Sequence, residues 1–449
     1  MLSLPRLIAY ALPAVPLAAL TLPLYTYIPT FYAEALGVPL AALGFALFAV
    51  RLFDAVNDPV IGVLADRFRP SFGRRRTWFL ASIPLVMLGV WNLFWPPEGA
   101  GVWHVALWTL VLSVGYTCAI LPYNAWGAEL DTSYEGRARI AATREGLTLT
   151  GTMVAIVLIA WLGWDNATEF HGFAALAVLL LVLLPLFGGL AVVAVPEPRE
   201  HSRRRVRVLE GFRELRHNRP FLRLLAAYVL NGFGNSLAAS LFLFYAGQRL
   251  GLADERGPLL LVFFVAGVFG IPFWTWLARR TSKHRSWCLA MVFAILVFWP
   301  TPFLPEGALV PFAIICVLSG LSLGADITLP AAVAADVIDV DTARTGEQRS
   351  GTYFALWGLA TKMSLALTAA LALPLLAWVG FDADNSAASS ATSLTLLAFL
   401  YGWGPIVMKA AAVWLMWRFP LDREAVLQLR RAIEDDRSAQ TPREGQSVA

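Results

Sequence analysis

The sequence predicts an all-α polytopic membrane protein of about twelve spanning helices, arranged as two six-helix halves. Of its 449 residues, 58% are hydrophobic and 15% are charged. In a typical soluble domain about a quarter of all residues are charged. Long apolar runs recur along the chain, and a helix that crosses the hydrocarbon needs about 20 mostly apolar residues. The alternation typical of barrel strands is absent, so helices are the structure that satisfies the backbone inside lipid.

The twelve expected spans are joined by segments too short to form a globular domain. They cover residues 7–32, 39–65, 77–96, 103–128, 143–163, 171–194, 221–248, 257–278, 286–304, 308–334, 352–378 and 391–418. The first span contains Pro13, Pro16, Pro23 and Pro29. Because proline interrupts the helical hydrogen bonds, we expect this span to be bent and to open backbone carbonyls toward a cavity.

A basic hydrophilic segment divides the spans into two sets of six. It covers residues 196–220, between an N-terminal bundle at 1–195 and a C-terminal bundle at 221–420, with a charged tail at 421–449. Transporters built from parallel repeats have this layout. Lys and Arg gather in every second loop, so both termini are expected to face the cytoplasm from a plasma (inner) membrane. The formal net charge of +4 then reflects topology rather than a nucleic-acid partner.

The second span contains charged residues that lipid disfavours. Asp54 and Asp58 are four residues apart and share one helical face, with Arg51 one turn earlier. A charge within a span costs roughly 2.5 to 3.5 kcal/mol on insertion scales, so each of these residues needs a partner or a function. Two carboxylates in a low dielectric do not both stay ionised without a positive charge. The pair predicts a site that holds and releases Na⁺ or H⁺. Alternatively, Arg51 neutralises one aspartate and the other faces water.

The residues around this pair match a known family signature. The stretch Arg51-x-x-Asp54-Ala-Val-Asn57-Asp58-Pro59, continuing to Gly62, Asp66 and Gly73-Arg74, resembles helix 2 of the glycoside-pentoside-hexuronide:cation symporters, the family of the melibiose permease in the major facilitator superfamily. Matching segments elsewhere are Tyr116-Thr117, Pro122-Tyr123, Ala335-Asp336-Val-Ile-Asp339 and Lys362. The resemblance implies the major facilitator fold and cation-coupled sugar or glycoside transport by alternating access. It also implies cation binding by Asp54, Asp58 and Thr117, with Asn57 a less certain member.

Lys362 interrupts an otherwise apolar span. It is the only charged residue between Tyr353 and Val379, so it must either extend to the membrane surface or pair with an acid. We expect it to pair with the aspartates of the second span. A cation and the lysine ammonium would then compete for the same carboxylates.

The loop after the second span resembles the loop signature of the major facilitator superfamily. It is expected to form a cytoplasmic gate from Gly62, Asp66, Arg67, Gly73 and Arg74, unless it is an ordinary basic loop of the cytoplasmic side. The resemblance adds Asp336 and Asp339, placed just after the tenth span, as partners of bases such as Arg144. The alternative for these aspartates is a solvated charge at a helix end.

Candidate solute-binding residues are aromatic and amide side chains inside the spans: Tyr25, Tyr123, Asn124, Trp126, Asn231, Asn235 and Trp357. They could stack on a sugar and bond its hydroxyls, or they could pack and bind neighbouring helices. Where the resembling family holds sugar hydroxyls with two acids, this chain has Ala18 and Ile120. A less polar or amphipathic solute, or an uncoupled facilitator, is therefore the alternative to a sugar symporter.

Other function classes fit the sequence poorly. The five histidines lie at span edges or in loops, and the three cysteines lie inside spans without metal-ligand spacing. An enzyme is therefore not expected, nor is a channel, because no repeated filter segment is present. The expected partners are a small solute, the coupling ion Na⁺ or H⁺ and membrane lipid, with no cofactor or other metal and with the chain as a monomer.

Overall fold

The computed structural model describes residues 2–67, 72–131, 134–162, 171–197, 218–345, 350–383 and 389–420. Within these residues, twelve helices are long and apolar enough to cross a membrane, which confirms the all-α polytopic class. The elements of the first half of the chain are α1 (Leu4–Ala11), α2 (Ala14–Leu22), η1 (Pro23–Tyr27), α3 (Ile28–Glu34), α4 (Leu40–Arg67), α5 (Arg74–Phe94), α6 (Val102–Glu129), α7 (Tyr134–Leu162) and α8 (His171–Ala194). The elements of the second half are α10 (Arg219–Phe244), η2 (Tyr245–Arg249), α11 (Arg256–Arg280), α12 (Lys283–Phe298), η3 (Thr301–Phe303), α13 (Leu309–Thr345), α14 (Ser350–Trp378) and α15 (Ala391–Met416).

The first span is broken into segments, as its prolines predict. A turn at Leu12 and Pro13 separates α1 from α2, and Pro23 begins η1, a π-helical turn. Proline lacks the amide hydrogen and its ring clashes with the carbonyl four residues earlier, so it bends or interrupts a helix. Short π-helical turns inside helices often accompany functional sites.

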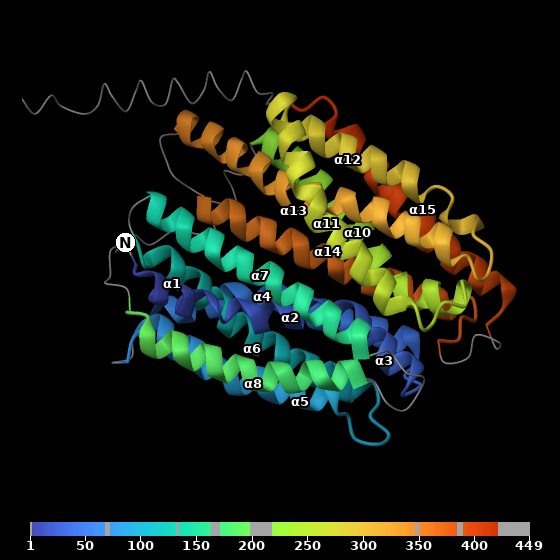
Figure 1. Cartoon of the computed structure of the whole chain (residues 1–449), viewed down its shortest axis with the longest axis horizontal. Coiled ribbons are helices and arrows are strands. Elements are labelled where there is room, and N and C mark those ends of the chain that lie inside the picture. The colour runs from blue at the N-terminus through green and yellow to red at the C-terminus, as the bar shows by residue number, and fades with distance from the viewer. Residues whose placement is uncertain are drawn as a thin grey trace, which may run out of the picture.

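Figure 1 shows two groups of helices side by side. The group from α1 to α8 lies along one side of the molecule and the group from α10 to α15 along the other. Between the groups, α4 packs along α14 and α7 packs along α11. Gly44 of α4 permits this approach, because a Cβ atom there would lie 2.6 Å from the backbone oxygen of Ala369 in α14. Most of the expected linker (198–217) and the whole tail (421–449) lie outside the described residues.

The tenth spanning helix is longer than the sequence predicts. The expected span ends at residue 334, but α13 continues to Thr345. Nothing between Ala335 and Thr345 breaks a helix, since the next glycine is Gly346. Asp336 and Asp339 therefore lie inside the helix rather than after it, and hydropathy alone underestimates a helix that continues beyond the hydrocarbon.

Candidate functional site

Asp54 is the more deeply buried of the two aspartates in α4. It has 0% exposure, and one carboxylate oxygen accepts a hydrogen bond from Nη1 of Arg51 at 3.0 Å. Its other oxygen accepts a hydrogen bond from the hydroxyl of Ser113 in α6. A buried carboxylate held by a guanidinium and a hydroxyl is neutralised in place, so Asp54 joins α4 to α6.

Asp58 connects three helices and both groups of the fold. Its Oδ1 atom accepts a hydrogen bond of 2.9 Å from the Thr117 hydroxyl in α6, and its Oδ2 atom pairs with the Lys362 ammonium from α14. The side chains of Asp58 and Lys362 are 27% and 24% exposed, whereas Asp54 is fully buried. The Asp58–Lys362 pair is therefore less enclosed by protein than the Asp54–Arg51 pair.

Asn57 lies beside this cluster with an incomplete hydrogen-bond set. It is 9% exposed, and its amide nitrogen has no hydrogen-bond partner in the described part of the chain. The carboxylates of Asp54 and Asp58 and the hydroxyl of Thr117 are oxygen ligands of the kind that hard cations take. The structure thus brings these three residues together with Arg51 and Lys362.

The start of α5 contacts two glutamates that the sequence analysis did not select as partners. Glu129 at the end of α6 pairs with Arg74 at 3.1 Å and with Arg75 at 2.6 Å. Glu197 accepts a hydrogen bond of 2.8 Å from the backbone nitrogen of Arg75 at the start of α5. Gly73 has a φ of +117°, a backbone conformation that side-chain-bearing residues rarely adopt, which explains the glycine at this position.

The expected gate also includes Gly62, Asp66, Arg67 and Asp339. Gly62 has open space where a Cβ atom would be, so no close approach explains the glycine in this conformation. The side chains of Asp66, Arg67 and Asp339 lie outside the described residues.

The expected partnership between Arg144 and Asp336 is not the one that the structure forms. Asp336 pairs with Lys283 at 2.7 Å, and Arg144 pairs with Glu145 at 2.6 Å and donates a hydrogen bond of 2.7 Å to Asn124. Lys283 opens α12, which packs directly on α13. It therefore reaches Asp336 from within the same group of helices.

Three solute candidates pack against other aromatic rings or a backbone carbonyl. Tyr123 is buried and stacks on Tyr10 with ring centroids 4.9 Å apart. Trp126 is also buried and donates a hydrogen bond of 3.0 Å to the carbonyl of Pro196. Trp357 stacks on Tyr228 with ring centroids 3.8 Å apart. The side chain of Tyr25 lies outside the described residues.

Asn231 and Asn235 of α10 belong to a buried polar cluster around Asp326 of α13. Their amide nitrogens donate hydrogen bonds of 3.1 and 2.9 Å to the two oxygens of this carboxylate. Trp287 of α12 donates a third bond at 2.8 Å and Lys409 of α15 a fourth at 3.2 Å. Asp326 and Lys409 are each 9% exposed. The sequence analysis missed both, although a charge inside an apolar span was available as a signal.

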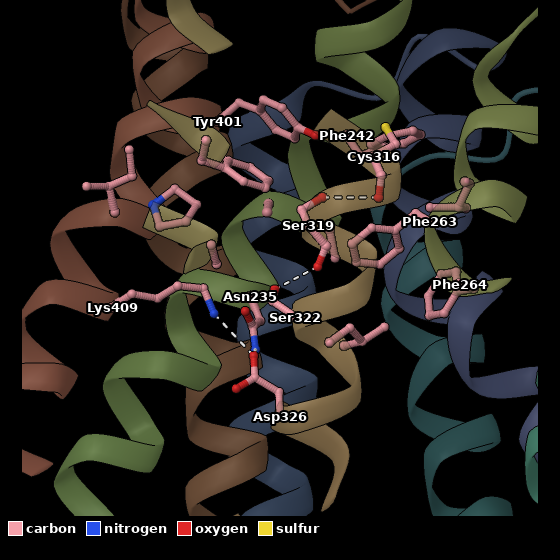
Figure 2. A pocket seen from close by; sticks show the side chains of 18 of the residues that line it. Asn235, Phe242, Phe263, Phe264, Cys316, Ser319, Ser322, Asp326, Tyr401 and Lys409 are labelled. Atoms are coloured by element: carbon pink, nitrogen blue, oxygen red, sulfur yellow. Dashed lines mark hydrogen bonds and ion pairs between the residues drawn. The ribbon is translucent and has the colours of Figure 1, made fainter. Parts of the chain in front are cut away.

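This cluster forms one end of a cavity of about 190 Å³. Figure 2 shows Lys409, Asp326 and Asn235 at that end, with the rings of Phe242, Phe263 and Tyr401 around the space above them. Its other lining residues are mostly apolar. Thr26 of η1 also lines the cavity, so the cavity lies where the first group of helices meets the second.

Comparison with known proteins decides the family. The MFS/sugar transport protein family matches residues 9–423, which is most of the chain. The chain belongs to the MFS/sugar transport protein family.

Relatives in and around the MFS/sugar transport family carry different solutes. A sodium-dependent lysophosphatidylcholine symporter 1-A of Danio rerio is 24% identical over 84% of this chain and 78% of its own length. An isoprimeverose transporter of Lactiplantibacillus pentosus is 21% identical over 85% of this chain and 81% of its own length. A crystal structure of the nucleoside transporter NupG has a TM-score of 0.61 at 12% identity, covering 92% of this chain and 99% of that one. This member of the family is therefore a multi-pass membrane transporter rather than an enzyme.

An ion pair joins the two groups of helices far from Asp58 in the chain. Nη1 of Arg256, at the start of α11, lies 2.8 Å from Oε2 of Glu34 at the end of α3, and both side chains are largely buried. We expect Arg256→Gln to open this side of the cavity, because a hydrogen bond between charged groups contributes about 1.5 to 3 kcal/mol and its loss shifts an equilibrium about tenfold or more.

Labelling of the native Cys316, which lines the cavity, with a membrane-impermeant maleimide measures this opening. Peptide mass spectrometry separates Cys316 from the other two buried cysteines, Cys118 and Cys288. Arg280→Gln, on the exposed opposite end of α11, is the matched control and should leave the labelling rate unchanged. Equal rates in both variants would contradict a closing role for the Arg256–Glu34 pair.

Proposed function

We propose that the protein is a secondary active symporter that couples Na⁺ or H⁺ to the movement of a small solute. The observation that carries this proposal is the position of Asp58, which lies between the Thr117 hydroxyl and the Lys362 ammonium and whose side chain is 27% exposed. The name of the Danio rerio relative, a sodium-dependent symporter, supports coupling to a cation.

The coupling works by exchange of positive charge at Asp58. When a cation binds the Asp58 carboxylate, Lys362 loses its partner, and the bond between α4 and α14 across the two groups is released. The groups can then rearrange so that access changes from one side of the membrane to the other. The Asp58 carboxylate is thus neutralised in both states, whereas the released Lys362 ammonium needs water or another acceptor in the loaded state.

A link between the two polar clusters passes through α10. The Ser364 hydroxyl of α14 donates a hydrogen bond of 3.1 Å to the carbonyl of Val229, and the hydroxyls of Tyr228 and Thr361 lie 3.0 Å apart. Thr361 precedes Lys362, and Asn231 follows Val229 closely along α10. Movement of Lys362 is therefore passed to the helix that holds Asn231 and Asn235 at the cavity.

The cavity favours a solute less polar than a sugar. Its walls are mainly apolar, and Ala18 and Ile120 are a buried and a partly buried apolar residue. A pyranose needs hydrogen bonds around its ring, whereas the polar side chains of this lining are a minority: the cluster at Asp326 and a few hydroxyls, among them that of Thr26. We therefore prefer an amphipathic solute, with a sugar as the second candidate because a relative is named an isoprimeverose transporter.

We also propose an orientation in the membrane, the units that move and an oligomeric state. The alternate basic loops place both termini on the cytoplasmic side of an inner membrane. The two six-helix bundles, 1–195 and 221–420, are the units that move, with 196–220 as their linker. We propose that each monomer works alone, because one chain supplies Asp58, Lys362 and the cavity together.

Uptake into proteoliposomes tests the proposal. Labelled solutes of graded polarity, including a hexose, a glycoside and an amphipathic anion, are offered with an inward Na⁺ gradient, with an inward H⁺ gradient and with neither. Accumulation above equilibrium with one gradient supports symport and identifies the ion. Equilibration that no gradient changes would mean an uncoupled facilitator and would overturn the proposal.

A further inference from the structure

The polar end of the cavity combines a carboxylate whose oxygens are already fully bonded with an ammonium that has an unused N–H donor. The Asp326 carboxylate already accepts four N–H bonds, two on each oxygen, which is about the number its lone pairs can accept. The Lys409 ammonium has three N–H groups and uses two, one to Asp326 and one to Oδ1 of Asn231 at 2.8 Å. One ammonium N–H thus has no partner in the described chain.

A second unpaired polar group lines the cavity from the other group of helices. Thr26 is 1% exposed, and its hydroxyl has no hydrogen-bond partner within the described residues. It lies in the π-helical turn η1, where the broken first span passes the cavity. A buried hydroxyl without a partner is costly to the fold. Its retention at a cavity wall therefore points to a partner that is not part of the chain.

The rest of the cavity is small and mainly apolar, with the hydroxyl-bearing side chains of Ser319, Ser322 and Tyr401 as its other polar members. The aromatic rings of Phe242, Phe263 and Tyr401 contribute to its walls. Its volume of about 190 Å³ exceeds that of a cavity of about 150 Å³ that holds benzene. A compact apolar body fits this space, whereas a second cation has no free carboxylate lone pair to bind there.

We propose that this cavity is a solute site for a small amphipathic anion, with its carboxylate or phosphate on the Lys409 ammonium and the Thr26 hydroxyl and its apolar body among the aromatic rings. A charged acceptor is favoured over a neutral one, because hydrogen bonds to an ionised group are about twice as strong. That the bound anion is the transported solute rests on the proposed function. The binding of an anion in this cavity does not depend on the proposed function.

Ligand-induced thermal stabilisation of the full chain in lipid nanodiscs tests the proposal. The probes share one apolar body and differ in the head group: 3-phenylpropionate, 2-phenylethyl phosphate, 3-phenyl-1-propanol and 3-phenylpropylamine, with methyl glucoside as a sugar. We expect one or both anions to raise the Tm in a saturable way and the amine to have no effect. The carboxylate and phosphate arms distinguish the two possible sources of the anionic head.

Thr26→Val is the decisive variant, because it removes a hydroxyl that has no partner in the fold and keeps its shape. We expect its Tm without probe to equal or exceed that of the wild type, and its apparent affinity for the anion to fall about fivefold. Thr109→Val is the matched control, since Thr109 is another buried threonine with an unpaired hydroxyl, in α6 and away from the cavity lining. Its anion affinity should equal that of the wild type.

Three results would overturn the proposal: no anion stabilises the wild type, the amine stabilises it more than the anions do, or Thr26→Val and Thr109→Val bind the anion equally. Saturable anion binding that weakens in Thr26→Val supports the proposal even where uptake needs no cation gradient. That combination of results would contradict coupling to a cation and would support the proposed anion site.

Discussion

Asp58→Asn should abolish cation-driven accumulation of the solute while leaving the protein folded. Asparagine keeps the shape of the side chain and can still accept the Thr117 hydroxyl bond of 2.9 Å, but it no longer neutralises Lys362 or attracts a cation. Since a hydrogen bond to a charged group contributes about 1.5 to 3 kcal/mol, we expect apparent cation affinity to fall at least about tenfold. The measurement is uptake against the concentration gradient, together with the Tm of the protein at increasing Na⁺ and at decreasing pH.

The same substitution at the neighbouring aspartate serves as the comparison. Asp54 is fully buried and bonded to Arg51 and Ser113, so Asp54→Asn removes the carboxylate that Arg51 needs. Its main effect should be a lower Tm in every salt condition. If Asp58→Asn kept full gradient-driven accumulation, the exchange between Lys362 and a cation would be wrong.

Lys409→Met should strongly destabilise the protein, and by more than the same change at Lys362. The methionine fills a similar volume, but it leaves the Asp326 carboxylate, which is 9% exposed, without the lysine ammonium that pairs with it. Removing one partner of a buried ion pair typically costs about 3 to 5 kcal/mol. The double variant Lys409→Met with Asp326→Asn should recover part of this loss, because it removes the unpaired charge as well. The free energy of unfolding in mixed micelles with increasing denaturant measures both.

Lys362→Met makes the same chemical change at a lysine that is 24% exposed. Because both side chains of this pair are about a quarter exposed, we expect screening of the charge that remains on Asp58 and a loss of about 1 kcal/mol or less. Equal destabilisation by Lys362→Met and Lys409→Met would show that burial does not distinguish the two lysines. It would also remove the reason for assigning Lys409 to a fixed polar cluster and Lys362 to a movable pair.

Much of the fold could be predicted from hydropathy and proline positions. Apolar runs of about 20 residues identify spanning helices because lipid leaves few other structures for them. Pro13 and Pro23 likewise predict the breaks in the first span. The end of α13 could not be predicted this way, because a helix that leaves the hydrocarbon keeps its hydrogen bonds while its hydropathy falls.

The site was only partly predictable. Asp54, Asp58 and Lys362 stand out as charges in apolar spans, and a resemblance to known symporters adds Thr117. Asp326 and Lys409 carry the same kind of signal, yet the sequence does not say that α13 and α15 bring them within 3.2 Å. The cavity is harder still, since it depends on the packing of rings from several helices. Tyr123 and Trp126 are the converse case, because a buried aromatic residue and a cavity-lining one look alike in sequence.

The pairing at Asp58 also bears on how membrane voltage acts on the carrier. In the empty state the two carboxylates of α4 are balanced by Arg51 and Lys362, so this region carries no net charge as the protein reorients. A bound cation adds one elementary charge, which is worth about 2.3 kcal/mol per 100 mV across the membrane. The electric field would therefore drive the loaded crossing and leave the empty return almost unaffected.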